Sequence, residues 1–379
     1  MYQNVIDFIR EQYGTNEFIP LHEPRFIGNE KKYLNDCIDS TFVSSVGKYV
    51  DKFEEEVAKY TGSKYAIATV NGTSALHIAL LLAGATNNDE VITQPLTFVA
   101  TCNALSYIGA HPTFIDVDKN TLGLSPEKLE TYLLKNTQIE KGVCVNKKTK
   151  RKIKAVVPMH TFGLPINIEA LKFVCDKYHL NIVEDAAESL GSYFKNYHTG
   201  TIGLLGTLSF NGNKTITTGG GGMILTNHKE LARKAKHITT TAKIPHRWDY
   251  EHDMIAYNYR LPNINAAIGC AQMEELSKFL LSKQALAKTY SDFFSKTQIK
   301  FVETPQNTKS NYWLNAIILN SKEERDNFLE QTNNAGVMTR PIWRLMNSLE
   351  MFKNAQCGNL ENSEWLEQRV VNIPSSVRI

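Results

Sequence analysis

The sequence lacks a long apolar run, a cysteine motif and a large net charge. Its longest apolar stretch, residues 79–85, is far shorter than the ~18 residues of a membrane-spanning helix. The N-terminus carries Asp7 and has neither the basic head nor the apolar run of a signal peptide. We therefore expect a cytoplasmic protein with no membrane segment.

Six cysteines are scattered along the chain, and none has the spacing of a zinc site or of a small disulfide framework. Reduced thiols and no metal site are expected. Lysine and arginine number 42 against 39 aspartate and glutamate residues, and a net charge of +3 does not indicate a nucleic-acid partner.

What is present is a regular alternation of short apolar runs with helical patterns. The 379 residues suffice for about two domains. From about residue 64 to residue 227 this alternation predicts an α/β fold with a mainly parallel, seven-stranded sheet between helices. Because the runs are uniformly apolar, helices should bury both faces of the sheet. The expected strands are 65–70, 90–93, 112–116, 154–159, 181–184, 207–210 and 223–226.

The pattern changes after Pro262. A long helix is expected at 263–294, then strands at 299–303 and 312–319, and a helix that begins at the capping box formed by Ser321 and Glu324. This pattern predicts a smaller α+β domain. We therefore expect an N-terminal segment and large domain in residues 1–255, and a linking helix with a small domain in residues 256–379.

The first segment suited to chemistry lies at the end of the first strand. There Asn71 and Gly72 are followed by Thr73 and Ser74, which open an apolar helix. Backbone N–H groups, hydroxyls and the positive end of the helix dipole converge at such a point and favour a bound phosphate. The alternative is that Thr73 or Ser74 only caps the helix.

Two further segments carry reactive groups. Asp185 comes directly after a buried strand, at the sheet edge where α/β proteins bind ligands, although it could instead be a helix cap. Lys214 lies in a tight segment before the glycines 219–222, which allow close approach of a ligand, although most lysines are surface groups. In this order the segments supply the phosphate cradle, carboxylate and Schiff-base amine that pyridoxal phosphate requires. The sequence has no dinucleotide, P-loop, serine-hydrolase or zinc-protease motif.

On these residues the chain resembles the DegT/DnrJ/StrS family of sugar aminotransferases, which are fold type I pyridoxal phosphate enzymes. The similarity extends from about Phe18 to the C-terminus. The matching segments are 71–76 (NGTSAL), 94–101 (QPLTFVAT), 114–118 (FIDVD), 184–187 (EDAA), 209–214 (SFNGNK), 217–222 (TTGGGG) and 257–260 (YNYR).

The resemblance implies roles for individual residues. Lys214 would form the Schiff base, Asp185 would pair with the pyridine nitrogen and Phe98 would stack on the ring, with core packing as the alternative for Phe98. Glu188 stands where relatives commonly have Gln or His near the phenolic oxygen, so its carboxylate would need a proton or a bridging water. The remaining implied cofactor contacts are Gly72, Thr73, Ser74, Ser209, Asn211 and, from a neighbouring subunit of a homodimer with shared sites, Asn258.

The sequences of residues 43–47 (VSSVG) and 209–214 are most similar to the LegC-type branch of the family. That branch implies transfer of an amino group from glutamate, with release of 2-oxoglutarate, to a UDP-linked 4-keto-6-deoxy-N-acetylhexosamine for a bacterial surface glycan; a dTDP-linked sugar stays open. Candidate sugar-nucleotide contacts are Ser44, Ser45, Lys48, His160 and Arg340.

Other functions remain open on the same scaffold. Amination of a C3-keto sugar or of a cyclitol ketone is possible, and a noncatalytic module that binds pyridoxal phosphate or a nucleotide for regulation is the alternative of another class. Sugar dehydratases of the family carry histidine in place of the Schiff-base lysine, and the presence of Lys214 argues against that branch.

Overall fold

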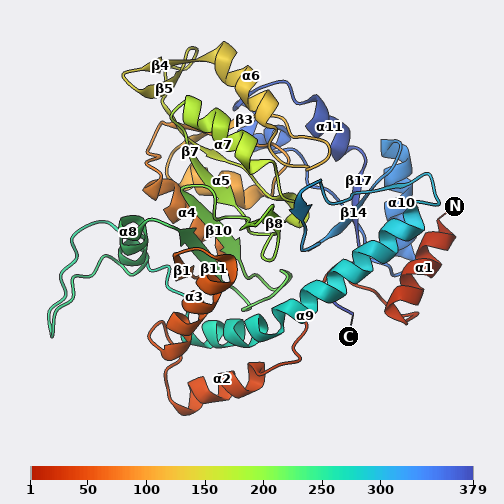
Figure 1. Ribbon diagram of the computed structural model, residues 1–379, viewed down its shortest axis with the longest axis horizontal. Coiled ribbons are helices and arrows are strands. Elements are labelled where there is room, and N and C mark those ends of the chain that lie inside the picture. Colours follow the sequence, from red (N-terminus) through yellow and green to blue (C-terminus); the bar gives the residue numbers. More distant parts are fainter. Residues whose placement is uncertain (1, 379) are drawn as a thin grey trace.

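The computed structural model describes residues 2–378. At its centre lies an eight-stranded sheet in which every strand except β11 runs in the same direction (Figure 1). In sheet order the strands are β1 (Tyr65–Thr69), β11 (Gly222–Thr226), β10 (Leu205–Ser209), β7 (Asn181–Asp185), β6 (Ile153–Val157), β2 (Glu90–Thr93), β3 (His111–Phe114) and β16 (Gln356–Cys357).

The predicted fold class is confirmed, and each of the seven expected strands is present. The eighth strand, β16, was not expected, because a pairing of two residues leaves no periodic pattern in the sequence. Its Gln356 pairs with Thr113 and its Cys357 with Phe114 of β3. The C-terminal part of the chain therefore reaches back to the edge of the large sheet.

Helices bury both faces of this sheet, as the uniformly apolar strands predict. Within β1, Ile67 belongs to the core shared with α4, α5 and α8, whereas Ala66 and Ala68 belong to the core shared with α3 and α9. Farther along that second face, α6 and α7 cover β2, β6 and β7. These helices are α3 (Lys48–Thr61), α4 (Gly72–Leu82), α5 (Val99–Tyr107), α6 (Pro126–Asn136), α7 (Ile168–Lys177), α8 (Lys229–Thr239) and α9 (Asn263–Phe294).

The long helix α9 leads into a small domain with an antiparallel sheet. In sheet order its strands are β12 (Lys300–Phe301), β14 (Asn315–Ile318), β17 (Val370–Ile373) and β15 (Arg340–Pro341), packed against α10 (Lys322–Asn334). Ser321 caps α10 by accepting the Glu324 N–H at 3.2 Å, as the capping box predicts.

The N-terminal helix α1 (Gln3–Tyr13) packs with the small domain, where its Ile6 and Ile9 share a core with Phe328 and Val371 (Figure 1). The division at residue 255 grouped this helix with the large domain. Sequence order alone could not show the difference, because the apolar stripe of α1 is compatible with either domain.

The remaining elements connect the parts described above. They are α2 (Glu30–Asp39), β4 (Thr137–Glu140), β5 (Val143–Asn146), η1 (Thr161–Gly163), β8 (Tyr193–Phe194), β9 (Tyr197–His198), β13 (Thr308–Lys309), η2 (Met346–Ser348), η3 (Glu350–Phe352) and α11 (Glu361–Glu367).

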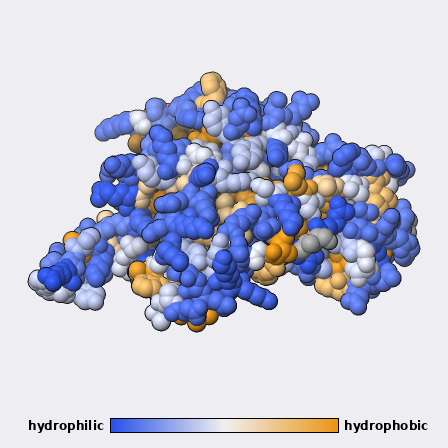
Figure 2. Space-filling view, turned by 60° about the horizontal axis from the view of Figure 1, so that its bottom comes forward, coloured by the Kyte–Doolittle hydropathy of each residue, from blue (hydrophilic) through white to orange (hydrophobic). Residues whose placement is uncertain are grey.

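On the face shown in Figure 2, the described residues form no large apolar area. Most of this face is hydrophilic, with hydrophobic residues in separate patches. No helix within residues 2–378 is long and apolar enough to cross a membrane.

Candidate active site

The predicted phosphate cradle lies where β1 leads into α4. Asn71 caps this helix, because its side chain accepts the Ser74 N–H at 2.7 Å. The cap is therefore neither Thr73 nor Ser74, the two capping residues considered from the sequence. A Cβ on Gly72 would lie 2.9 Å from the Ser209 Cβ, so glycine allows the start of α4 to lie against the end of β10. The first N–H groups of the helix are left available for an anion.

Asp185 ends β7 and is buried. Its carboxylate accepts hydrogen bonds from Thr101 Oγ1 at 2.8 Å and from the Ala187 N–H at 3.2 Å. Burial raises the pKa of Asp185, and the hydrogen bond from Thr101 and the charge of Lys214 oppose that rise. A buried carboxyl in this position suits a protonated ring nitrogen as its partner.

Lys214 lies in the tight segment after β10, where its N–H donates to the Asn211 carbonyl at 3.0 Å. Its Nζ lies 3.3 Å from Glu188 Oε1 and 3.9 Å from the centre of the Trp313 ring. Only 14% of the side chain is exposed. The alternative that Lys214 is a surface group is therefore wrong. Its ammonium has both a carboxylate and an aromatic face as partners.

Glu188 lies beside Lys214 with only 2% of its side chain exposed. Its Oε2 accepts the Phe162 N–H at 2.9 Å. Burial raises the pKa of Glu188 to about 7, while the charge of Lys214 lowers it. A carboxyl that titrates near neutrality can carry the proton that the resemblance required at this position.

These segments meet around one cavity of about 310 Å³ at the carboxyl ends of β7 and β10. Phe98, half-exposed at the start of α5, lines it together with Trp343, with 6.3 Å between their ring centres. Eight of the expected site residues line the cavity: Gly72, Thr73, Phe98, Asp185, Glu188, Ser209, Asn211 and Lys214.

The other expected residues lie outside this cavity within the single chain. His160 is fully buried, with Nε2 3.0 Å from Glu184 Oε2 and with Nδ1 accepting the Ile166 N–H at 3.3 Å. Lys48 is exposed and pairs with Asp36 at 2.7 Å. Neither contributes to the lining. The remaining residues absent from the lining are Ser44, Ser45, Ser74, Asn258 and Arg340.

The lining side chains that sequence reasoning did not propose include Thr101, Trp313 and Trp343. Thr101 lies one helical turn after Phe98 and ends the matching segment 94–101, which was the available signal. Trp313 and Trp343 come from the small domain, far from the other segments in sequence. Trp313 also donates its indole N–H to the Asn213 carbonyl at 2.6 Å, which fixes its ring beside Lys214.

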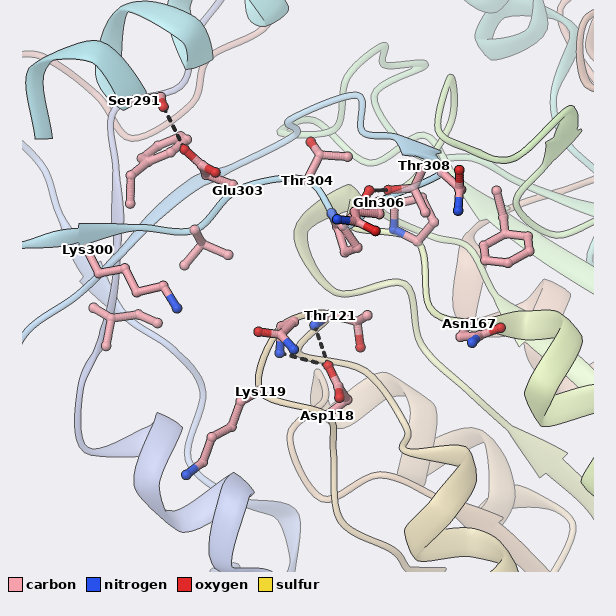
Figure 3. Close-up of a pocket in the computed structure, with 18 of the residues that line it drawn as sticks. Asp118, Lys119, Thr121, Asn167, Ser291, Lys300, Glu303, Thr304, Gln306 and Thr308 are labelled. Atoms are coloured by element: carbon pink, nitrogen blue, oxygen red, sulfur yellow. Dashed lines mark hydrogen bonds between the residues drawn. The ribbon is translucent and has the colours of Figure 1, made fainter. Parts of the chain in front are cut away.

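A second, larger groove of about 1050 Å³ lies between the starts of α6 and α7 and residues 297–308 (Figure 3). Asp118 there accepts the N–H groups of Asn120 and Thr121, and Glu303 accepts from Ser291 Oγ at 2.9 Å. The lining of this groove includes none of the expected site residues. The candidate active site is therefore the smaller cavity.

Comparison with known proteins identifies the family. Residues 24–379 match the DegT/DnrJ/EryC1/StrS aminotransferase family. The chain belongs to this family. It is 36% identical to GDP-perosamine synthase of Escherichia coli O157:H7 over 364 residues, which cover 95% of this chain and 93% of that protein. GDP-perosamine synthase of Vibrio cholerae is 36% identical over 360 residues and 94% of each chain.

Solved structures of the family share the fold. A family member from Brucella abortus superposes with a TM-score of 0.84 at 25% identity, covering 92% of this chain and 90% of that one. PseC of Helicobacter pylori, an aminotransferase of pseudoaminic acid biosynthesis, gives 0.85 at 24% identity over 94% of each chain, a likeness that concerns the fold alone. The family expected from the sequence is confirmed, and the narrower LegC-type placement stays a prediction.

This chain is thus a pyridoxal phosphate-dependent sugar aminotransferase. The cavity fits the cofactor on its own chemistry. It offers an amine at Lys214, a buried carboxyl at Asp185, a helix start at Gly72 for the phosphate and an aromatic face at Phe98.

Proposed function

We propose that this chain transfers the amino group of glutamate to the C4 keto group of a nucleotide-linked 6-deoxyhexose for a bacterial surface glycan. The observation that carries the proposal is the meeting of Lys214, Asp185 and the start of α4 in one cavity. Three segments far apart in the sequence supply the amine, the carboxyl and the anion site.

When bound, pyridoxal phosphate supplies an aldehyde carbon and an electron-accepting ring. Lys214 Nζ is the amine we place beside that carbon. It takes the proton from the α-carbon of glutamate and, in the second half of the reaction, delivers a proton to the former keto carbon of the sugar. Asp185 holds a proton on the ring nitrogen, and 2-oxoglutarate is the first product.

Four further residues of the lining hold the cofactor in this proposal. Gly72 and Thr73 present the N–H groups of the first turn of α4 to the phosphate, and Ser209 adds its hydroxyl. Phe98 lies against the ring. Ser74 acts indirectly, because its N–H orders the Asn71 side chain at the start of the helix.

Two observations favour different nucleotides on the sugar substrate. Short segments similar to the LegC-type branch favour a UDP-linked N-acetylhexosamine, whereas the two relatives at 36% identity over nearly the whole chain are named for GDP-perosamine. Because the match to these relatives spans nearly the whole chain, whereas the LegC-like segments are short, we propose a GDP-linked sugar first and the UDP-linked sugar second.

We further propose a homodimer with shared sites. A projecting arm connects α8 to α9 and precedes Asn258 (Figure 1). On this arm Trp248, Tyr250 and Ile255 are 73%, 77% and 92% exposed. Large apolar side chains on a projecting arm favour burial against another chain. Asn258 would then reach the phosphate of a second copy. The nucleotide contacts proposed outside the cavity are Ser44, Ser45, Lys48 and Arg340.

The test is a substrate panel. The purified chain, loaded with pyridoxal phosphate, is incubated with glutamate and GDP-, UDP- or dTDP-linked 4-keto and 3-keto hexoses and a cyclitol ketone, and amino products are identified by mass spectrometry and NMR. A 4-amino sugar supports the proposal, with GDP and UDP yields ranking the nucleotides. Products only from a 3-keto sugar or the cyclitol would replace the C4 assignment. A visible cofactor band that glutamate leaves unchanged would favour a noncatalytic module.

A further inference from the structure

Glu188 and Lys214 form an ion pair inside the cavity, with 3.3 Å between Glu188 Oε1 and Lys214 Nζ. The exposed fractions of the two side chains are 2% and 14%. The second carboxylate oxygen of Glu188 accepts the Phe162 N–H, which comes from the turn η1, at 2.9 Å. The orientation of the carboxyl is therefore fixed, and little water screens the pair.

The other titratable groups around the pair are already engaged. Asp185 accepts two hydrogen bonds from neighbouring residues, and His160 is bonded to the residue before Asp185. Burial and the charge of a neighbouring lysine hold the pKa of His22 well below its ordinary value, so this ring is neutral. Lys214 is the cation that contacts Glu188.

A lysine forms a bond to a carbonyl carbon only as an uncharged amine. If the Lys214 ammonium lost its proton to water, an ionised Glu188 would stay buried without a counter-charge, which is costly. If the proton passed to Glu188, both groups would be neutral. Burial already raises the pKa of Glu188 to about 7, and the charge of Lys214 is the largest influence opposing that rise.

We propose that Glu188 is the proton partner of Lys214, taking up the proton that the ammonium releases and returning it when the amine is free again. In this step one N–H bond of Lys214 breaks, its electron pair stays on Nζ, and one O–H bond forms on Glu188 Oε1. The net charge of the pair is zero before and after. The inference deepens the proposed function at the same site, and its tests use the full chain without cofactor or sugar, so that its failure is distinguishable from failure of the substrate assignment.

The first test is Glu188→Gln, which keeps an acceptor for the Phe162 N–H and removes the charge. Lys214 acetylation by acetic anhydride is measured against pH by peptide mapping. Because the ammonium loses its counter-charge, the midpoint of this profile should move to lower pH by about 1–3 units. Asp185→Asn is the matched control, a buried carboxyl of the same cavity that does not contact Nζ, and it should shift the profile less. No shift in Glu188→Gln, or equal shifts in both variants, would overturn the proposal.

The second test observes Glu188 itself in Lys214→Met, so it holds even if the glutamine variant does not fold. The infrared carbonyl band of a protonated carboxylic acid is followed against pH and assigned to Glu188 by its change when Glu188→Asp, which keeps a carboxyl at this position, is added. Without the lysine charge, the midpoint for Glu188 should rise by about 1–3 units relative to the wild type. A midpoint equal to that of the wild type would overturn the proposal.

Discussion

Replacing Lys283 with methionine should remove a pH dependence of stability that this one residue creates. Lys283 lies in α9 with 1% of its surface exposed. Its Nζ donates to the carbonyls of Trp313 and Ser375 at 3.2 and 2.6 Å and lies 2.9 Å from His22 Nε2. These partners include no carboxylate. Burial therefore lowers the pKa of Lys283 to about 7, from an ordinary value of 10.5.

The sign of the effect is set by proton binding. Between pH 7 and pH 10.5 the unfolded chain holds a proton on Lys283 that the folded chain has lost, so the free energy of unfolding rises with pH over this window. A difference of about 3.5 units in pKa corresponds to about 5 kcal/mol at ~1.4 kcal/mol per unit. In Lys283→Met this rise should disappear, and the carbonyls left without a donor should lower stability at every pH.

The assay is urea unfolding of wild type and variant at several pH values from 7 to 10, monitored by circular dichroism. Lys288→Met is the matched control on the same helix, since its side chain is 75% exposed. Its stability difference from the wild type should not change with pH. If the difference between wild type and Lys283→Met is also constant across this window, Lys283 keeps an ordinary pKa when buried and the reasoning fails.

Three further variants test the site. Lys214→Ala should abolish amination and leave no cofactor attached to the chain after borohydride reduction, and a normal rate would withdraw its role. Asn71→Ala should lower the free energy of unfolding by about 1 kcal/mol through loss of the helix cap and should loosen cofactor retention on dialysis, with Asn71→Ser restoring both. Gly222→Ala would place a Cβ 2.4 Å from the Asn71 backbone carbon and should impair cofactor binding, whereas Gly212→Ala meets nothing within 4 Å; equal binding by the two variants would contradict this account.

Local sequence signals were sufficient for seven of the eight strands of the large sheet and for the placement of Asp185 and Lys214 at one edge of it. Each expected strand is buried on both faces, so its apolar run is continuous and stands out from the flanking turns. Asp185 and the segment of Lys214 lie at the ends of β7 and β10, which pair in parallel with Thr207 opposite Asp185. Because parallel strands end at the same edge of a sheet, the order of these segments in the sequence predicted their proximity.

The features that sequence reasoning missed depend on contacts between distant parts of the chain. Trp313 lies beside Lys214 because the small domain folds back over the end of the large sheet, and no periodicity in the sequence encodes that placement. The packing of α1 with the small domain has the same origin. Glu188 was recognised as a departure from the family pattern, but its burial and its contact with Phe162 are tertiary.

The charge of the cavity bears on where the sugar nucleotide binds. Among the described residues that line it, Lys214 is the one basic side chain, and Glu188 already neutralises it, while Asp185 adds a carboxyl. The start of α4 can hold one phosphate through N–H groups, but a nucleotide diphosphate carries further negative charge that this lining does not offset. The cations that bind it must then lie outside the cavity of the single chain. We expect these cations to include the exposed side chains of Lys48 and Arg340, which would approach from the mouth of the cavity or from a second copy of the chain. Replacing either residue should raise the KM for the sugar nucleotide and leave the glutamate half-reaction unchanged.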